Sequence, residues 1–191
     1  WLIVGGLSMP LIMCAANVVL GVDEALSESL GVLPMLASAL AVALYVVPYE
    51  AGVPLWSRTM AGATVLMTFM TLSPIGVEGA TDVALNDAAM LTIFYAASMI
   101  PILAAAGNVF QTARSNWGLA SSSAASSAVM LGMFLLVGSA IGHLFLGSDA
   151  NSEHEIQYLA SSMETLFLWG GMGMIAWGGV MSCFPQATGR T

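Results

Sequence analysis

Lysine is absent from this chain, and arginine occurs only as Arg58, Arg114 and Arg190. The eleven acidic residues bring the formal net charge to −8, which would repel the phosphates of DNA or RNA, so we expect no nucleic-acid partner. Charged residues make up 7% of the chain, whereas a soluble domain carries roughly 25%. The shortage of charge therefore excludes an ordinary water-soluble globule.

Cysteine is almost as scarce. Cys14 and Cys183 lie in apolar runs without the spacing of a disulfide framework, so we expect both to be small buried side chains. The sequence also has no Ser-His-Asp constellation and no phosphate-binding glycine loop, so it gives no support for soluble enzyme chemistry. No basic segment precedes the apolar start at Trp1, and we therefore expect no signal peptide and a natural start further upstream.

Long apolar runs dominate what is present, and hydrophobic residues make up 58% of the chain. About 20 such residues in a helix cross a bilayer core of about 30 Å. Helices are expected throughout, because an open sheet in lipid would leave its backbone groups unpaired. The sequence predicts an all-α, polytopic transmembrane bundle, a single integral membrane domain over residues 1–191. Its six predicted spans are residues 1–22, 30–48, 59–77, 85–112, 119–147 and 156–184.

The positions of the charges predict an orientation. The arginines fall after the second, fourth and sixth spans, and the positive-inside rule makes their side the cytoplasm of a plasma-membrane protein. Nine of the eleven acids fall in the opposite, outer loops: Asp23, Glu24, Glu28, Glu78, Asp82, Asp87, Asp149, Glu153 and Glu155. This outer surface could attract cations to a site. We favour adaptation to high salt, as in a halophile, because the acids are spread over three loops.

Small residues predict close helix packing in the last two spans. The fifth span opens with ASSSAASSA (120–128) and continues to Gly138-x-x-x-Gly142. The sixth contains Gly170, Gly171, Gly173, Gly178 and Gly179. The fourteen methionines could suggest a copper pathway, but their scattered positions favour adaptable packing.

Glu164 is the one acid inside a predicted span. It shares a helix face with Ser161 and Gln157, which form a polar stripe toward the outer surface. A carboxylate in the membrane is costly and is a functional hypothesis by default. Two interpretations stay open: a proton or cation path along this stripe, or a protonated carboxyl group hydrogen-bonded to a neighbouring helix.

Both histidines fall toward the outer side. His143 lies near the outer end of the fifth span, and His154 lies in the next loop between Glu153 and Glu155. A histidine flanked by carboxylates can bind a divalent metal. A solvated loop is the commoner outcome, and we favour it here.

Several motifs follow one another in a recognisable order. The end of the chain, WGGVMSCFPQATGR (177–190), runs small and aromatic residues into Pro-x-x-Thr-Gly-Arg. Upstream come Gly138-Ser-Ala-Ile-Gly142 and Tyr158. Together these motifs resemble the ninth and tenth helices of heme-copper oxidase subunit I, which carry Gly-Gly-x-x-Gly, a loop Tyr and the same terminal motif.

The resemblance extends to the first half of the chain. Pro48 and Pro54-Leu-Trp-Ser-Arg58 resemble the proline pair and aromatic-basic turn between that family's sixth and seventh helices. Ser73-Pro-Ile-Gly76 resembles the approach to its paired histidines, and Pro101 lies near the proline of its eighth helix. The resemblance implies a subunit I-like bundle, helices five to ten of twelve, with the loops on the sides that the charges predict.

The family's metal ligands are replaced at the matching positions. Ser29 stands where the resemblance places a copper-binding His, and Leu33 where it places the Tyr one turn later. Glu78-Gly79 replaces the His pair, and Met163-Glu164-Thr165 replaces the His-x-His that holds both haems.

Other functional positions of the family also differ. Glu155 and Ile156 occupy the positions of the His and Asp near its magnesium ion, and Ala105 that of the Lys or Thr that feeds protons. Met163 is a conceivable haem ligand, because Met can bind haem iron, whereas Thr165 cannot replace His. Haem and copper are the family's cofactors, but we expect none in this chain alone.

The resemblance therefore implies a divergent relative of the oxygen-reducing cytochrome oxidases, associated with the aerobic respiratory chain and its electron transport but without its own metal centre. Its expected partners are the lipid bilayer and other respiratory-complex subunits or upstream helices. The alternative hypothesis is a small membrane transporter or ion channel that uses Glu164 in its polar stripe.

Overall fold

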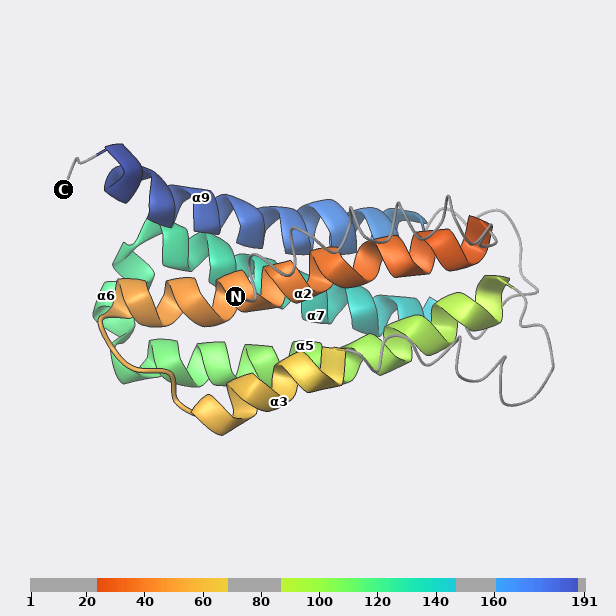
Figure 1. The fold of residues 1–191 in the computed structure, drawn as a ribbon, viewed down its shortest axis with the longest axis horizontal. Coiled ribbons are helices and arrows are strands. Elements are labelled where there is room, and N and C mark those ends of the chain that lie inside the picture. The colour runs from red at the N-terminus through yellow and green to blue at the C-terminus, as the bar shows by residue number, and fades with distance from the viewer. Residues whose placement is uncertain (1–23, 69–86, 147–160, 189–191) are drawn as a thin grey trace.

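All elements that the structure describes are helices. A computed structural model describes residues 24–68, 87–146 and 161–188. Its elements are α2 (Glu24–Ala51), α3 (Arg58–Thr68), α5 (Asp87–Ser115), α6 (Trp117–Ser122), α7 (Ala124–Leu146), the π-helix η3 (Leu166–Met172) and α9 (Gly173–Thr188). The long helices run side by side along one axis (Figure 1). The all-α prediction is confirmed for these residues, and the predicted span 1–22 lies outside them.

Three described segments are long and apolar enough to cross a membrane. They are Tyr95–Ser115, Ala124–Phe145 and Ser161–Phe184. A shorter apolar helix, Met35–Ala51, accompanies them. These four segments correspond to the second and the last three of the predicted spans, as expected of a membrane protein.

The helix boundaries differ most from the predicted ones in two places. The predicted span 30–48 is part of the longer helix α2. The predicted span 119–147 is interrupted at Ser123, whose extended backbone (φ −78°, ψ 123°) separates α6 from α7. The Ser123 hydroxyl accepts a hydrogen bond from the Ser126 backbone N–H at 3.3 Å, as a helix N-cap does. The serine-rich start of this segment therefore ends one helix and begins another.

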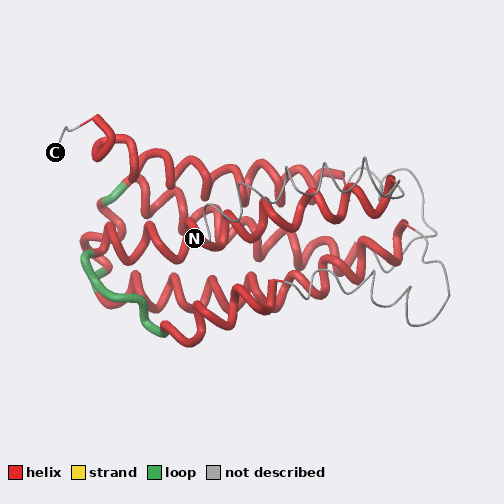
Figure 2. Tube along the Cα trace, viewed as in Figure 1, coloured by secondary structure: helices red, strands yellow, loops and turns green. Residues whose placement is uncertain are grey.

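Gly52 terminates α2. Its φ of +64° lies in the left-handed region, which glycine adopts without steric cost. The Gly52 N–H donates to the Tyr49 carbonyl, and the Val53 N–H donates to the Pro48 carbonyl at 3.1 Å. This pair of bonds is a Schellman motif, and it turns the chain toward α3. The described loop residues gather at this end of the bundle (Figure 2).

α7 is the central helix, and it packs on α2, α5, η3 and α9. The largest fully buried side chains come from several helices: Leu36, Leu40, Val46 and Val47 of α2, Ile102 and Val109 of α5, Val129, Met133 and Leu136 of α7, Phe167 of η3 and Ile175 of α9. The core is therefore shared by all the long helices.

Glycines allow α7 to approach the last span closely. A methyl group on Gly171 would lie 2.5 Å from Leu136 Cγ, and one on Gly178 would lie 2.7 Å from the Ala125 carbonyl oxygen. On α7, a methyl group on Gly132 would lie 2.7 Å from the Gly171 carbonyl oxygen. The predicted close packing of the last two spans is confirmed at these positions.

The last span contains a π-helix in the middle of its length. η3 covers Leu166–Met172 and includes the Gly170-Gly171 pair, at which the Leu136 side chain of α7 packs closely. π-helical turns within α-helices are rare and occur frequently at functional sites. Here the π-helix carries the fully buried Phe167 on one side and Trp169, 77% exposed, on the other.

Candidate functional site

Asn108 anchors the loop between α2 and α3 to the side of α5. Its side chain is fully buried. Its Nδ2 donates to the Ser57 carbonyl oxygen at 2.8 Å, and its Oδ1 accepts from the Ser57 N–H at 3.1 Å. One amide side chain thus satisfies both backbone groups of one loop residue, which would otherwise be costly to hold in an apolar bundle.

Two more residues near the end of α5 form hydrogen bonds to the backbone of the same loop region. The Thr112 hydroxyl accepts from the Trp56 N–H at 3.0 Å while donating to the Asn108 carbonyl at 2.7 Å. Asn116, just beyond α5, donates from Nδ2 to the Ala51 carbonyl at 2.9 Å. The loop is therefore fixed along the end of α5 by side chains spaced one turn apart.

Glu50 joins three parts of the chain at this end of the bundle. Its Oε2 accepts from the Ser123 hydroxyl at 2.8 Å, and its Oε1 accepts from the Ser182 hydroxyl at 2.6 Å. α2, the α6–α7 junction and α9 are thereby held by one half-buried carboxylate. Hydrogen bonds to a charged acceptor are stronger than neutral ones. The arrangement is that of a structural clamp.

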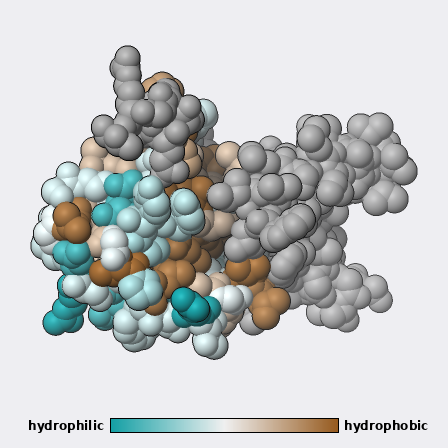
Figure 3. Space-filling view, turned by 60° about the vertical axis from the view of Figure 1, so that its left-hand side comes forward, coloured by the Kyte–Doolittle hydropathy of each residue, from teal (hydrophilic) through white to brown (hydrophobic). Residues whose placement is uncertain are grey.

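Arginines and tryptophans surround this end. Arg58 begins α3 and Arg114 lies in the last turn of α5, and both are exposed. Trp56 and Trp117 are also exposed, at 58% and 57%. Hydrophilic and hydrophobic side chains alternate over this end (Figure 3). Such a mixture is typical of the membrane–water interface.

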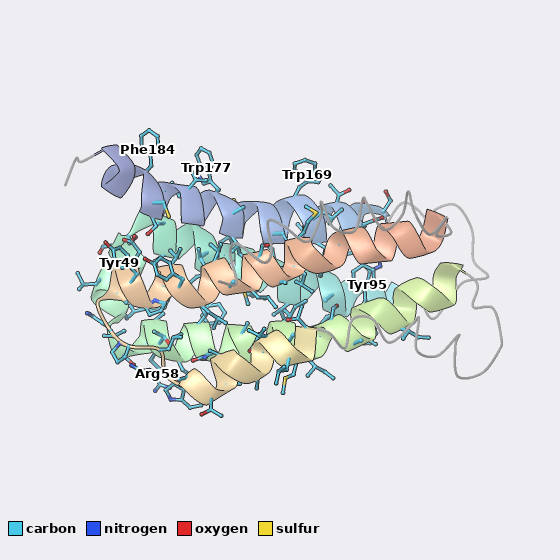
Figure 4. The ribbon with its side chains drawn as sticks, viewed as in Figure 1. Tyr49, Arg58, Tyr95, Trp169, Trp177 and Phe184 are labelled. Carbon is cyan, nitrogen blue, oxygen red and sulfur yellow. The ribbon has the colours of Figure 1, made fainter. Side chains whose placement is uncertain are left out.

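Aromatic rings meet at the opposite end of the bundle. Tyr95 of α5 stacks on His143 of α7, with ring centroids 3.8 Å apart and the planes 8° from parallel. Phe167 of η3 meets the Tyr95 ring edge-on at 5.3 Å. The three side chains are buried, and Figure 4 shows Tyr95 inside the bundle, far from Arg58. Three helices thus contribute to one aromatic cluster.

The polar atoms of this cluster are unequally satisfied. His143 is 8% exposed, and its Nε2 is buried without a hydrogen-bond partner in the part of the chain that the structure describes. Glu164 is exposed on the last span, one turn before Phe167. The cluster therefore combines a buried imidazole, a phenol and a nearby carboxylate.

The residues of the predicted proton or ion path are only partly described. Ser161 and Glu164 are both exposed on the last span, and Gln157 lies outside the described residues. The path along this stripe stays a prediction. The structure adds that Phe167, one turn after Glu164, packs on Tyr95, which sequence reasoning did not select.

Met163 has a packing role. A methyl group on Gly142 would lie 2.7 Å from the Met163 sulfur, so this side chain fills the space beside the glycine of α7. The predicted loop metal site, Glu153, His154 and Glu155, lies outside the described residues. Within the described ranges, no three His, Cys, Asp or Glu side chains are grouped to hold a metal ion.

One cysteine prediction is wrong. Cys183 is exposed, because it lies near the end of α9 on the face of that helix that no other described helix covers. Its neighbour Phe184 is 64% exposed and, like Trp177 and Trp169, points away from the bundle (Figure 4). An apolar run in a membrane helix does not distinguish a lipid-facing position from a buried one.

Sequence reasoning missed Glu50 and Asn108. Glu50 is an acid on the arginine side of the predicted topology, where acids are otherwise rare, and Asn108 is an amide inside a predicted span. Both residues could have been selected from the sequence, because a polar side chain is unusual at each of these positions. Their partners were not, because Ser123 and Ser182 of the clamp lie 73 and 132 positions away from Glu50.

The helices and their polar contacts define an all-α protein with three membrane-spanning candidates among its described helices. Comparison with protein-family models, with curated proteins and with solved structures finds no significant match.

Proposed function

We propose that the chain is a divergent relative of heme-copper oxidase subunit I that supplies helices, and no haem or copper centre of its own, to an aerobic respiratory complex. It lies in the plasma membrane with the end that carries Arg58 and Arg114 toward the cytoplasm. Its neighbours are lipid and other subunits of that complex or helices upstream of Trp1.

The observation that supports this proposal is what Met163 and Thr165 contact. These two residues stand where the resemblance places the haem-binding histidines. Met163 packs its sulfur against Gly142. Thr165 is exposed, and its hydroxyl donates to the Ser161 carbonyl of its own helix at 2.9 Å. The two side chains therefore serve helix packing and local hydrogen bonding. The Glu50 clamp and the Asn108 contacts likewise hold helices together, as a scaffold subunit requires.

A spectrum and a metal analysis test the first part of the proposal. The purified full chain is expected to show no haem band in a reduced-minus-oxidised visible spectrum and to contain far less than one iron or copper per chain. In detergent extracts of the source membranes, the chain is expected to migrate with a haem-containing complex on a native gel. A strong haem band with near-stoichiometric iron in the isolated chain, or migration apart from all haem, would refute the proposal.

A second function, a small proton or cation transporter, is favoured by one observation. Glu164 is exposed one turn before Phe167, which packs on Tyr95, and Tyr95 stacks on the buried His143, so ionisable groups extend from the surface into the bundle. Ionisable groups inside a membrane protein commonly mark ion or proton pathways.

Flux in proteoliposomes tests the second function. Glu164→Gln is expected to abolish proton flux, because the amide keeps the shape of the side chain but cannot carry the charge. Thr165→Ala, which changes the exposed neighbour, is the matched control and should leave flux unchanged. Equal flux in the Glu164→Gln and unaltered proteins, or none in either, would exclude this function.

A further inference from the structure

Two glycines of the last span face α7, and they lie seven residues apart. A methyl group on Gly178 would lie 2.7 Å from the Ala125 carbonyl oxygen, and one on Gly171 would lie 2.5 Å from Leu136 Cγ. Positions seven apart on a straight α-helix differ in direction by only about 20°. Seven residues before Gly171 comes Glu164. An uninterrupted α-helix would therefore turn Glu164 toward α7.

The π-helix η3 lies between these positions and rotates the residues before it. An α-helix turns 100° per residue, and a π-helical turn holds one residue more, so the rotation amounts to about 100°. Glu164 is accordingly exposed. The inward positions before Gly171 instead follow every four residues: Phe167 is fully buried, and the Met163 sulfur lies beside Gly142 of α7. The π-helix thus exchanges Met163 for Glu164 at the surface of α7.

The contacts of the two glycines show what Glu164 would meet in an α-helical span. Gly178 and Gly171 lie against Val129 and Leu136, so the contacts advance by seven residues on α7 as well, in the opposite chain direction. One more interval of seven leads from Leu136 to His143. The side chain opposite Glu164 in that state is therefore His143.

His143 has an unused hydrogen-bonding atom at this place. The side chain is 8% exposed, and its Nε2 has no partner in the part of the chain that the structure describes. Buried polar atoms are nearly always paired, and each exception calls for an explanation. The neutral carboxyl group of Glu164 has one O–H, which can donate to Nε2 of a neutral imidazole. Such a pair places no charge in the apolar interior, where an ion would be costly.

We propose that the last span switches between two states by converting η3 between π-helix and α-helix. In the described state Glu164 is exposed and Met163 packs beside Gly142. In the α-helical state Glu164 turns toward α7, and its neutral carboxyl group donates to His143 Nε2. Only hydrogen bonds and packing contacts change, and rearrangements of this size in helices take microseconds to milliseconds. The switch depends on neither proposed function.

Disulfide formation in the full chain in lipid nanodiscs distinguishes the two states. Both native cysteines are first replaced by serine. The first pair, Gly142→Cys with Met163→Cys, reports the described state, because a methyl group on Gly142 would lie 3.3 Å from Met163 Cγ, within the reach of a disulfide. The second pair, Ser139→Cys with Glu164→Cys, reports the α-helical state, since Ser139 is fully buried one turn before His143. We expect both pairs to form disulfides under mild oxidation.

The matched control for the second pair is Ser139→Cys with Thr165→Cys. Thr165 is exposed in the described state, and six α-helical residues place it about 120° from the direction of Gly171 in the other state. The control pair should form at least about tenfold more slowly than the second pair, because neither state brings it together. Equal rates for these two pairs would overturn the proposal.

Deletion of Trp169 tests the role of the π-helix itself. Trp169 is 77% exposed and points away from the bundle (Figure 4), so its loss removes the extra residue of η3 with little change in packing. The span then becomes α-helical with Glu164 fixed on the exposed side. The second pair should form at least about tenfold more slowly, whereas the first pair still forms and shows that the fold is kept. An undiminished second pair would contradict the switch, and if the first pair is lost, the comparison in the undeleted chain decides.

A ¹⁵N spectrum tests the pairing with Glu164 in place. The chain has only two histidines, so His154→Gln leaves His143 as the single histidine signal. We expect a second Nε2 signal, or exchange broadening, from the hydrogen-bonded state. Glu164→Ala should remove it, whereas Ser161→Ala, on the same exposed stripe, should not. A single sharp signal in the unaltered Glu164 chain, or a second signal that persists in Glu164→Ala, would refute the pairing.

Discussion

Replacing Gly178 with alanine is expected to destabilise the protein by about 1–3 kcal/mol, the usual cost of forcing extra volume into a packed interior. The added methyl group would lie 2.6 Å from Val129 Cγ2, 2.7 Å from the Ala125 carbonyl oxygen and 3.2 Å from the Val129 backbone nitrogen. Two of these three atoms belong to the backbone of α7, so no side-chain rotation relieves the overlap. α9 must move away from α7.

The matched control is Gly138→Ala. Gly138 lies on α7 itself, and a methyl group there meets no atom within 4 Å. This substitution should be neutral or stabilise the helix by up to about 1 kcal/mol, because alanine has the higher helix propensity. Thermal or denaturant unfolding in detergent, followed by circular dichroism, measures both variants. Equal stability of the two would show that α7 and α9 are not in such close contact.

The glycines of α7 also show what the sequence could and could not predict. Gly138-x-x-x-Gly142 is a small-residue motif, and it predicted close packing in the fifth span. In the structure only Gly142 has a close neighbour among the described residues, the Met163 side chain, whereas Gly138 is exposed. Helical spacing identifies a candidate face, but which glycine meets a neighbour depends on the rotation of each helix about its axis. Tertiary packing alone sets that rotation.

The helices themselves were predictable because lipid leaves few alternatives. Apolar runs of sufficient length must be helical in a bilayer, and those that correspond to α2, α5, α7 and the last span are. Within these runs the hydrophobic pattern did not predict the break at Ser123 or the π-helix at Leu166–Met172. At both places the chain contacts another helix, since Ser123 donates to Glu50 of α2 and Gly171 lies against Leu136 of α7, and a single sequence does not contain those contacts explicitly.

The candidate site was predicted less well than the fold. Glu164 stood out because it is an acid in an apolar run, and in the structure it lies one turn before Phe167, which packs on Tyr95. Tyr95 and His143 come from helices 48 positions apart, and aromatic residues are common enough in membrane helices that neither was selected as part of one cluster. Pairings of this kind require the three-dimensional arrangement.

Polar side chains that hold a loop against a helix should contribute as much to the stability of the fold as the close glycine contacts do. In an apolar bundle, each unpaired backbone group costs about 1–3 kcal/mol, so a side chain that satisfies two of them is a large stabilising element. Asn108 does this for both backbone groups of Ser57, and it is fully buried. Its removal would leave two groups unpaired at once.

Asn108→Leu is therefore expected to lower the free energy of unfolding by about 2–4 kcal/mol. The loss becomes smaller where water reaches the half-buried loop and pairs with the freed backbone groups. The leucine fills a similar volume, so the loss reports the hydrogen bonds and not a cavity. Hydrogen–deuterium exchange of residues 52–58 should also accelerate strongly, because the Ser57 amide loses its acceptor.

Gln111→Leu is the matched control. It makes the same amide-to-leucine change on α5, three residues later, at an exposed position. It should alter stability by no more than about 0.5 kcal/mol and leave exchange in the loop unchanged. If both variants are equally stable and the loop exchanges no faster in Asn108→Leu, the loop is held by Thr112 and Asn116 without help from Asn108. The contrast thus isolates one side chain's contribution to the end of the bundle that carries the arginines.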